Sequence, residues 1–332
     1  MQRGAMARAT GLDLVRVCAA LSVFLFHGRL FAGVALGGPL ASHGALAVEV
    51  FFALSGFLIY RPFTRGAVPS IDYLLRRVVR IIPGIAVAIV GIGLLLPGGY
   101  PWLMVVLWTL LVEATFYASL PLFARLVRRH ELVVVIALTV PSLAVDQLLG
   151  PIQLPGMLLL IPLLAPAWWW AFGLGMALAL IERDRPDLLR PRVLTAAGIL
   201  LLVAGIAVLD RLPTSISSDV GALPIVLSAV GIMGASINWR PTTGAKAATL
   251  AADISYPFYL WHAPVLAALS PVATGYPMLA AALAVTAAAS TVSVLCVERP
   301  VRRVWTRSRA ASRARLLALT NAASFRNTVA GD

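Results

Sequence analysis

Long apolar stretches separated by short polar segments recur along the whole chain. A membrane-spanning helix needs about 20 mostly apolar residues, and about ten stretches meet that requirement. They cover residues 12–34, 45–61, 78–97, 102–124, 132–149, 156–181, 193–209, 220–238, 247–269 and 276–297. Prolines at 155, 162 and 166 interrupt the sixth stretch, so it is either a span or an interfacial piece followed by a span. The pattern predicts an all-α polytopic membrane protein with about ten transmembrane helices.

Positively charged residues are concentrated in every second connection between the stretches. The clusters lie within residues 61–80, 125–129, 183–192, 240–246 and 299–315. Arg29 and Arg211 are the basic residues near the opposite ends of the stretches. Because positive charge marks the cytoplasmic side of a membrane protein, this alternation predicts that both termini are cytoplasmic.

The composition agrees with a membrane protein. The chain is 60% hydrophobic and 12% charged, whereas a soluble domain has roughly 25% charged residues. The net charge of +13 is distributed over short connections, which favours membrane orientation and argues against a nucleic-acid partner. We expect a transmembrane domain over residues 1–306, and a basic cytoplasmic tail over 307–332 that is disordered or lies on the membrane surface.

Several ionisable residues lie inside the predicted spans, where charge is costly and is therefore a functional hypothesis by default. They are Asp13, Arg16, His27, Glu49, Glu113, Asp146, Asp253 and His262. Cys18 and Cys296 both fall in apolar stretches, and their positions predict neither a disulfide framework nor a metal site.

Arg16 and His27 lie in the first span, 11 residues apart. Eleven residues are about three helical turns, so both side chains share a face and stand about 16 Å apart along the axis. Asp13, three residues before Arg16, can pair with it on that face. Either residue alone is more simply explained as a snorkelling arginine or a structural histidine bonded to a neighbouring helix. Together they predict a polar channel that leads inward from the cytoplasm.

Arg76, Arg77 and Arg80 precede the third span. Arginine binds phosphate through paired donors, although ordinary membrane anchoring is the simpler explanation of this cluster alone. Glu113 lies near the middle of the fourth span, and Tyr117 lies on the same helical face, where the two side chains can bond. A structural hydrogen-bonded Glu113 and a functional one are equally good explanations.

His262 lies in the ninth stretch, at a depth similar to that of His27. Pro257 and Pro264 flank it and free backbone groups that can line a cavity. Two histidines from distant parts of the chain are thus predicted at one level of the membrane.

Six motifs, in order along the chain, resemble the signatures of one family. They are GLDLVRVCAALSVFLFH (11–27), VEVFFALSGFLIYRPF (48–63), RRVVRIIP (76–83), LWTLLVEATFY (107–117), ISYPFYLWHAPV (254–265) and ERP (298–300). The chain resembles the acyltransferase-3 family of polytopic membrane O-acyltransferases, of the stand-alone type that lacks an extracytoplasmic hydrolase-like domain. It departs from the family pattern at Glu49, where Asp is more usual, and after Pro83, where an aromatic residue often follows.

The resemblance implies transfer of an acyl group, expected to be acetyl, from acyl-CoA to a hydroxyl of a carbohydrate or glycosylated small molecule. Acyl-CoA would be a co-substrate, with no bound cofactor and no metal. His27 would be the general base, because histidine titrates in the required range, and a covalent acyl-histidine is an open alternative. Asp13 would hold Arg16, and Glu113 would orient His27 or the acceptor. The expected CoA-binding residues are Arg16, Arg76, Arg77 and Arg80, and the expected acceptor-binding residues are Glu49, Tyr117, Tyr259 and His262. If His27 is not the base, His262 is the first candidate.

Two other classes of function fit the intramembrane charges. A transporter would use Asp, Arg, Glu and His as a relay, and acyl-CoA consumption that depends on His27 would exclude it. A membrane sensor with a degenerate site is disfavoured because the His, Arg and Glu residues are intact. The Arg-rich, nearly Lys-free composition favours a GC-rich bacterium, and hence its inner membrane. The expected partners are membrane lipid, acyl-CoA and a hydroxyl-bearing glycan, glycolipid or glycosylated metabolite, and short external loops favour a compact acceptor.

Overall fold

The computed structural model describes residues 10–34, 39–66, 71–96, 100–127, 130–149, 165–211, 214–239 and 243–312. Within these ranges the chain is built from helices, and no strand is present. The long helices are α1 (Thr10–Ala32), α3 (Ala47–Thr64), α4 (Ile71–Leu95), α5 (Tyr100–Val127), α6 (Glu131–Leu149), α8 (Trp169–Asp184), α9 (Pro191–Leu209), α10 (Thr214–Ser236), α11 (Ala245–Leu269) and α12 (Gly275–Val292). The short α2 covers Pro39–Ser42, and 3-10 turns cover Gly44–Leu46, Ala165–Trp168 and Pro186–Leu188.

The helices confirm the fold class, an all-α polytopic membrane protein. Among the described residues, six segments are long and apolar enough to cross a membrane. They are Thr10–Ala32, Gly44–Thr64, Ile71–Leu95, Pro101–Pro121, Pro191–Leu209 and Gly275–Ser312. The number of about ten spans and the cytoplasmic placement of the termini stay predictions.

Two predicted boundaries differ from the structure. In the sixth stretch, expected at 156–181, a helix covers Trp169–Asp184, and residues 156–164 lie outside the described residues. At the other end of the chain, α12 continues through a π-helical segment, Ser293–Glu298, and remains helical to Ser312. The helix therefore runs six residues into the expected tail, whose remainder, 313–332, is not described.

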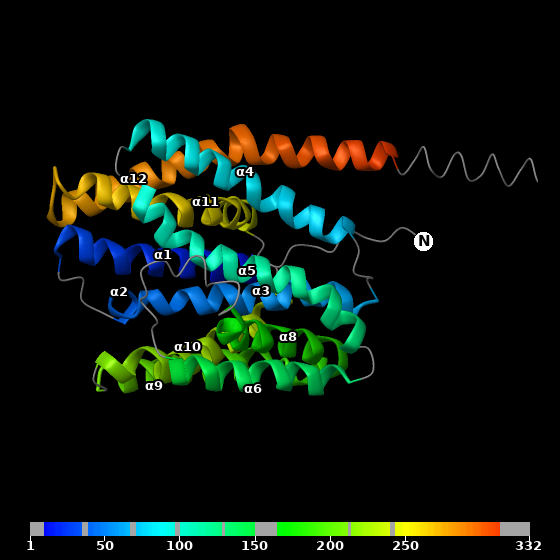
Figure 1. Cartoon of the computed structure of the whole chain (residues 1–332). Coiled ribbons are helices and arrows are strands. Elements are labelled where there is room, and N and C mark those ends of the chain that lie inside the picture. Colours follow the sequence, from blue (N-terminus) through cyan, green and yellow to red (C-terminus); the bar gives the residue numbers. More distant parts are fainter. Residues whose placement is uncertain are drawn as a thin grey trace, which may run out of the picture.

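Helix α3 lies between two groups of helices (Figure 1). On one side, α1 packs against α11, and α11 contacts α4, α5 and α12. On the other side, α3 packs closely against α8, which contacts α6, while α9 and α10 form a pair. Each side has its own apolar cluster, one around Phe57 and Phe172 and one around Phe24 and Trp261. The polar groups described below lie where α1, α3, α4, α5 and α11 meet.

Glycines bring α3 and α8 into backbone contact. A Cβ atom on Gly56 would stand 2.1 Å from the carbonyl oxygen of Phe172, and one on Gly175 would stand 2.0 Å from that of Ala53. No side chain fits at either distance, because the neighbouring atom is backbone and has no room to move. Small residues are the usual means of close helix association in a membrane, where lipid tails are as apolar as the side chains.

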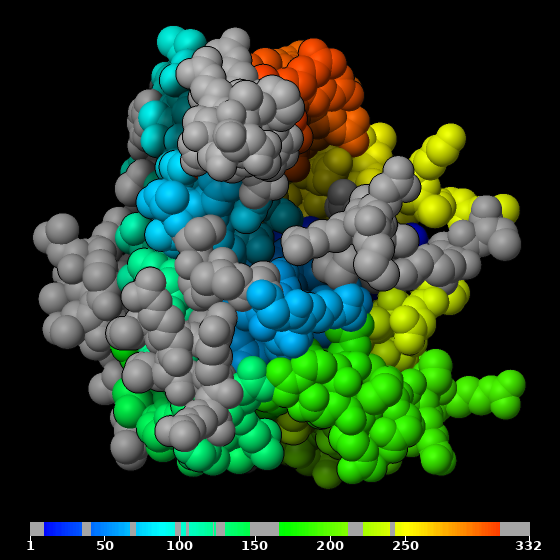
Figure 2. All heavy atoms as spheres, turned by 90° about the vertical axis from the view of Figure 1, so that its right-hand side faces the viewer, coloured from blue at the N-terminus to red at the C-terminus, as the bar shows by residue number. Residues whose placement is uncertain are grey.

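Ion pairs join α3, α6 and α8 at the end of the bundle seen in Figure 2. Arg61 at the end of α3 donates to Glu182 of α8, with Nη2 and Oε1 2.5 Å apart, and Arg65 donates to the same carboxylate at 3.1 Å. Arg183 of α8 pairs with Glu131 at the start of α6, at 2.5 Å. This end carries the basic residues that predict the cytoplasmic face. The ion pairs therefore fix the helix ends that border that face.

The backbone contact between α3 and α8 predicts that a methyl group added at Gly56 lowers the stability of the protein. Alanine forms helices better than glycine by about 1 kcal/mol, so a loss of stability in Gly56→Ala must come from the clash with Phe172. We expect a lower Tm for the detergent-solubilised variant. The control is Gly231→Ala in α10, where the added Cβ meets its nearest atom at 3.4 Å, an ordinary contact. Equal Tm values for the two variants would contradict this packing.

Candidate functional site

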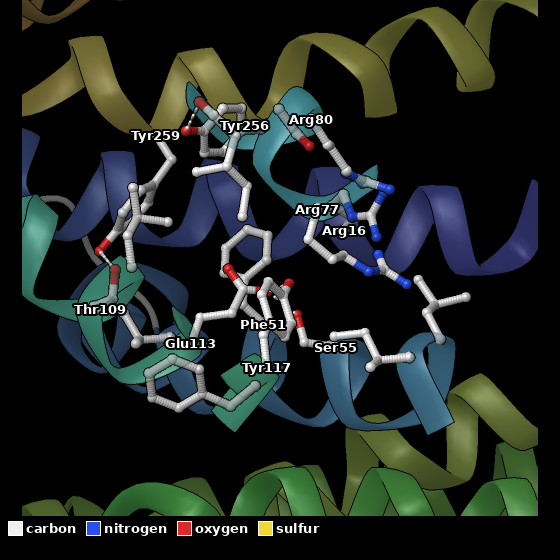
Figure 3. Close-up of a pocket in the computed structure, with 17 residues that line it drawn as sticks. Arg16, Phe51, Ser55, Arg77, Arg80, Thr109, Glu113, Tyr117, Tyr256 and Tyr259 are labelled. Atoms are coloured by element: carbon white, nitrogen blue, oxygen red, sulfur yellow. Dashed lines mark hydrogen bonds between the residues drawn. The ribbon is translucent and has the colours of Figure 1, made fainter. Parts of the chain in front are cut away.

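A cavity of about 100 Å³ lies between α1, α3, α4, α5 and α11. Figure 3 shows arginine side chains at one end of it and Tyr259 with Thr109 at the other. Polar groups along the lining are Arg16, Ser55, Arg77, Arg80, Thr109, Glu113, Tyr117, Ser255, Tyr256 and Tyr259. The spaces between them are filled by apolar side chains such as Phe51 and Ile81. The cavity thus has a mostly apolar wall along which polar groups are placed at intervals.

Three guanidinium groups converge at one end of the cavity (Figure 3). Arg16 comes from α1, whereas Arg77 and Arg80 come from α4 and share a face because they are three residues apart. Among the described lining residues, Glu113 is the one carboxylate against these three cations. The lining at this end therefore carries an excess of positive charge, which favours an anionic ligand.

Arg76 does not join the other arginines. Its side chain is exposed and lies 3.9 Å from Asp72, one turn away on the outer face of α4. Neighbouring residues on a helix point about 100° apart, so only one of Arg76 and Arg77 is able to face the cavity. Arg76 is therefore not among the residues that line the cavity, whereas Arg77 and Arg80 are.

Contacts from α11 and the end of α12 hold this part of α4. The Tyr256 hydroxyl donates to the carbonyl oxygen of Ile81, at 2.9 Å. Gly84, one turn further along α4, packs so closely on the Tyr256 ring that a Cβ would stand 2.6 Å from it. Glu298 is buried beside Gly84, accepts a bond from Ser293 at 3.0 Å and lies 3.6 Å from Arg302. Contacts with α11 and with the end of α12 thus hold the turn of α4 that carries the arginines.

Glu113 accepts hydrogen bonds from two side chains. The Ser55 hydroxyl of α3 donates to its Oε1 at 2.5 Å, and the Tyr117 hydroxyl donates to the same oxygen. The predicted contact between Glu113 and Tyr117 is therefore present. Arg77 lies over the Tyr117 ring, 5.6 Å from its centroid. This network connects the carboxylate in the middle of the cavity to the arginine cluster.

The opposite end of the cavity leads toward two histidines. Thr109 donates to the Tyr259 hydroxyl at 3.1 Å, which closes this end between α5 and α11. His262 lies almost one turn beyond Tyr259 and is 1% exposed. Its Nε2 stands 3.2 Å from Nδ1 of His27 on α1. The fold therefore places the two histidines in direct contact, just beyond the cavity.

His27 shares a face of α1 with Arg16, as the spacing predicts, although it does not line the cavity itself. His262 Nε2 contacts Nδ1 of His27, whereas Glu113 faces the cavity and accepts hydrogen bonds from Ser55 and Tyr117. The expectation that Glu113 orients His27 or the acceptor stays a prediction.

Two other expected site residues lie outside the cavity lining. Asp13 is 5% exposed and lies one turn before Arg16 in α1. Glu49 is half-buried in the first turn of α3, one residue after Val48 of the lining. The pairing of Asp13 with Arg16 and the contact of Glu49 with substrate stay predictions. Among the described residues, no cluster of three His, Cys, Asp or Glu side chains is arranged to hold a metal ion.

Four polar lining residues were missed from the sequence, namely Ser55, Thr109, Ser255 and Tyr256. Thr109 lies four residues before Glu113 and Tyr256 lies three before Tyr259, so helical spacing placed both on the faces of known candidates. Ser55 had no such signal, because its role depends on the approach of α3 to α5. Hydroxyl groups in a membrane helix are also common without any function.

The fold and this cavity define a polytopic membrane protein with a cationic site at one end of a cavity between its helices. A family model described as an acyltransferase domain, that of the acyltransferase-3 family, matches residues 10–298. The match includes every cavity residue and both histidines, and the chain belongs to this family. It is a membrane acyltransferase. Comparison with curated proteins and with solved structures gives no match.

The bond from Tyr117 to Glu113 predicts that Tyr117→Phe slows acyl transfer. A hydrogen bond to a charged group contributes about 1.5–3 kcal/mol, so we expect a loss of about tenfold or more. The control is Tyr73→Phe, because Tyr73 also packs on the Arg77 guanidinium, at 5.5 Å, but does not line the cavity. Transfer rates in membranes with equal amounts of each protein check this. If both variants lose activity equally, the bond to Glu113 has no special role.

Proposed function

We propose that this membrane acyltransferase moves an acyl group, most simply acetyl, from acyl-CoA to a hydroxyl of a carbohydrate or glycosylated small molecule. The observation that carries the proposal is the convergence of Arg16, Arg77 and Arg80 at one end of a cavity that runs toward His27. CoA is anionic through its phosphates and is made in the cytoplasm, and the arginines border the predicted cytoplasmic face.

Arg16, Arg77 and Arg80 would hold the phosphates of CoA. Arginine suits this task because its planar donors match phosphate oxygens in pairs and it stays charged when partly buried. A cavity of about 100 Å³ is too small for the whole donor, so the nucleotide would remain at the mouth while the pantetheine arm enters. Its thioester would then lie toward Tyr259 and the histidines. The limited space also favours a short acyl group.

His27 would act as the general base. The hydroxyl oxygen of the acceptor attacks the thioester carbonyl carbon while its proton passes to Nε2 of His27. The bond between carbon and sulfur then breaks, and the leaving thiolate takes the proton from the imidazolium. A positioned base of this kind contributes roughly 10²–10⁴-fold to a rate. Glu113, with Ser55 and Tyr117, would bind the polar part of a substrate in the middle of the cavity.

The membrane would be the inner membrane of a bacterium, with the arginine end on the cytoplasmic side. This placement follows from the basic residues at that end, which include Arg61, Arg65 and Arg183. The acceptor would be a hydroxyl-bearing glycan, glycolipid or glycosylated metabolite. It would approach the two histidines from the other side of the bundle.

Expression in a host without its own copy tests the proposal. Glycans, glycolipids and secreted metabolites from cells with the wild type and with His27→Ala are compared by mass spectrometry. We expect a species heavier by one acyl group in the wild type alone, and its mass names both acceptor and acyl group. The same species in both strains would remove His27 from the mechanism. Transport of an unmodified solute, with no acylated species in either strain, would favour a transporter instead.

The arginine pair on α4 gives a test of donor binding with an internal control. Arg77→Gln removes a guanidinium from the cavity, and we expect the Kd for acetyl-CoA to rise about tenfold or more, because a charged hydrogen bond is lost. Arg76→Gln removes the same charge one residue away, outside the cavity. We expect its Kd to stay close to that of the wild type. An equal effect of both variants would mean that only the general surface charge attracts the donor.

A further inference from the structure

The contact between the two histidine rings determines which ring nitrogens carry a hydrogen. His262 Nε2 stands 3.2 Å from His27 Nδ1. The other nitrogen of His262, Nδ1, lies 2.6 Å from the carbonyl oxygen of Tyr259. His27 Nδ1 also lies 3.1 Å from the carbonyl oxygen of Val23, in its own helix. Within the part of the chain that the structure describes, three of the four ring nitrogens therefore have a partner, and the fourth nitrogen is Nε2 of His27.

These partners fix which nitrogens carry a proton. A carbonyl oxygen only accepts, so His262 Nδ1 must carry the hydrogen that it donates to Tyr259. The neutral His262 ring then has a bare Nε2, which is an acceptor. His27 Nδ1 faces two acceptors, Val23 O and His262 Nε2, and so must carry a hydrogen. The bare nitrogen of neutral His27 is therefore Nε2.

We infer that His262 is a positioning residue, which fixes the tautomer and the ring orientation of His27 so that Nε2 of His27 is the basic nitrogen. The inference rests on the proposed function, in which His27 accepts the hydroxyl proton. The hydrogen bond made by one imidazole nitrogen decides which form the other takes. In hydrolases with a catalytic triad, a buried carboxylate fixes the tautomer of histidine in this way. Here the neutral His262 ring takes the place of that carboxylate.

A neutral partner suits this position in the bundle. Both rings lie among apolar side chains, where an added carboxylate would have to be removed from water at a cost of several kcal/mol. His262 accepts the Nδ1 hydrogen without carrying a charge. When His27 gains a proton at Nε2, its Nδ1 hydrogen still points at His262 and Val23. The ring therefore takes up and releases one proton without rearrangement of its partners.

Close packing of α1, α11 and their neighbours holds the two rings in place. A Cβ on Gly28, next to His27, would stand 2.4 Å from Leu279 of α12. The Trp261 ring, next to His262, occupies the space beside Gly91 of α4. Pro264 has no N–H to donate to the carbonyl of Leu260, so α11 lacks one helical hydrogen bond near the place where the rings meet. Neither helix is free to slide without losing these contacts.

Two substitutions of His262 separate tautomer control from packing. In His262→Gln the terminal amide reaches the position of Nε2 and offers an oxygen to His27 Nδ1. In His262→Asn the amide reaches only the position of Nδ1. Both side chains are polar and smaller than histidine, so both leave similar space in the core. The donor-binding arginines lie at the far end of the cavity and are unchanged in both variants.

We expect His262→Asn to lower kcat about 10²-fold, the lower end of what positioned proton transfer contributes. The KM for acetyl-CoA should stay near that of the wild type. His262→Gln should retain most of the activity. Full activity in His262→Asn, or equal losses in both variants, would overturn the inference, the second because it would indicate a purely structural role.

¹⁵N NMR measures the tautomer of His27 directly and does not require acyl transfer. The chain has four histidines, so selective ¹⁵N-histidine labelling with His27→Gln and His262→Gln as references assigns both rings. We expect a protonated Nδ1 and a bare Nε2 for His27 in the wild type, and loss of that single form in His262→Asn. A protonated Nε2 in the wild type would overturn the inference. If the wild type has this tautomer but transfers no acyl group, the proposed function fails while the tautomer assignment stands.

Discussion

The cost of placing charge inside an apolar bundle constrains this molecule more than any other interaction. Arg16, Arg77 and Arg80 meet at one end of a cavity, where the side chains of Arg16 and Arg77 are partly buried. Like charges at such a place persist only when the helices that carry them are held by other contacts. The Tyr256 bond to α4, the buried Glu298 and the Glu113 network are such contacts. An anionic donor would complete this arrangement when it binds.

The helices on the two sides of α3 make different kinds of contact. α3 and α8 interlock through Gly56 and Gly175, where backbone meets backbone and leaves no room for adjustment. That rigid pair supports Ser55, which reaches from α3 to the carboxylate of Glu113. On the other side, α1 and α11 meet through His27 and His262 and through close apolar packing. The candidate site therefore lies where α1, α4, α5 and α11 meet α3.

Helical periodicity accounts for the parts of the site that sequence analysis found. The spacing of 11 residues places Arg16 and His27 on one face of α1, and four residues place Tyr117 beside Glu113, because one helix fixes both relationships. Contacts between helices follow from packing angles and depths that local spacing does not encode. For this reason the bond between His27 and His262, and that from Ser55 to Glu113, were found only in the structure. The sequence likewise does not distinguish Arg76 from Arg77, because both belong to one cluster of arginines.

We propose that one donor molecule lies along the cavity, with its phosphates at the arginines and its acyl group toward the histidines. The most direct measurement is photocrosslinking with a CoA thioester whose acyl group carries a diazirine, followed by peptide mass spectrometry. We expect labelling of α1 and α11 close to His27, Tyr259 and His262, and competition by acetyl-CoA. Labelling that lies instead on α9 and α10, outside the cavity, would contradict it.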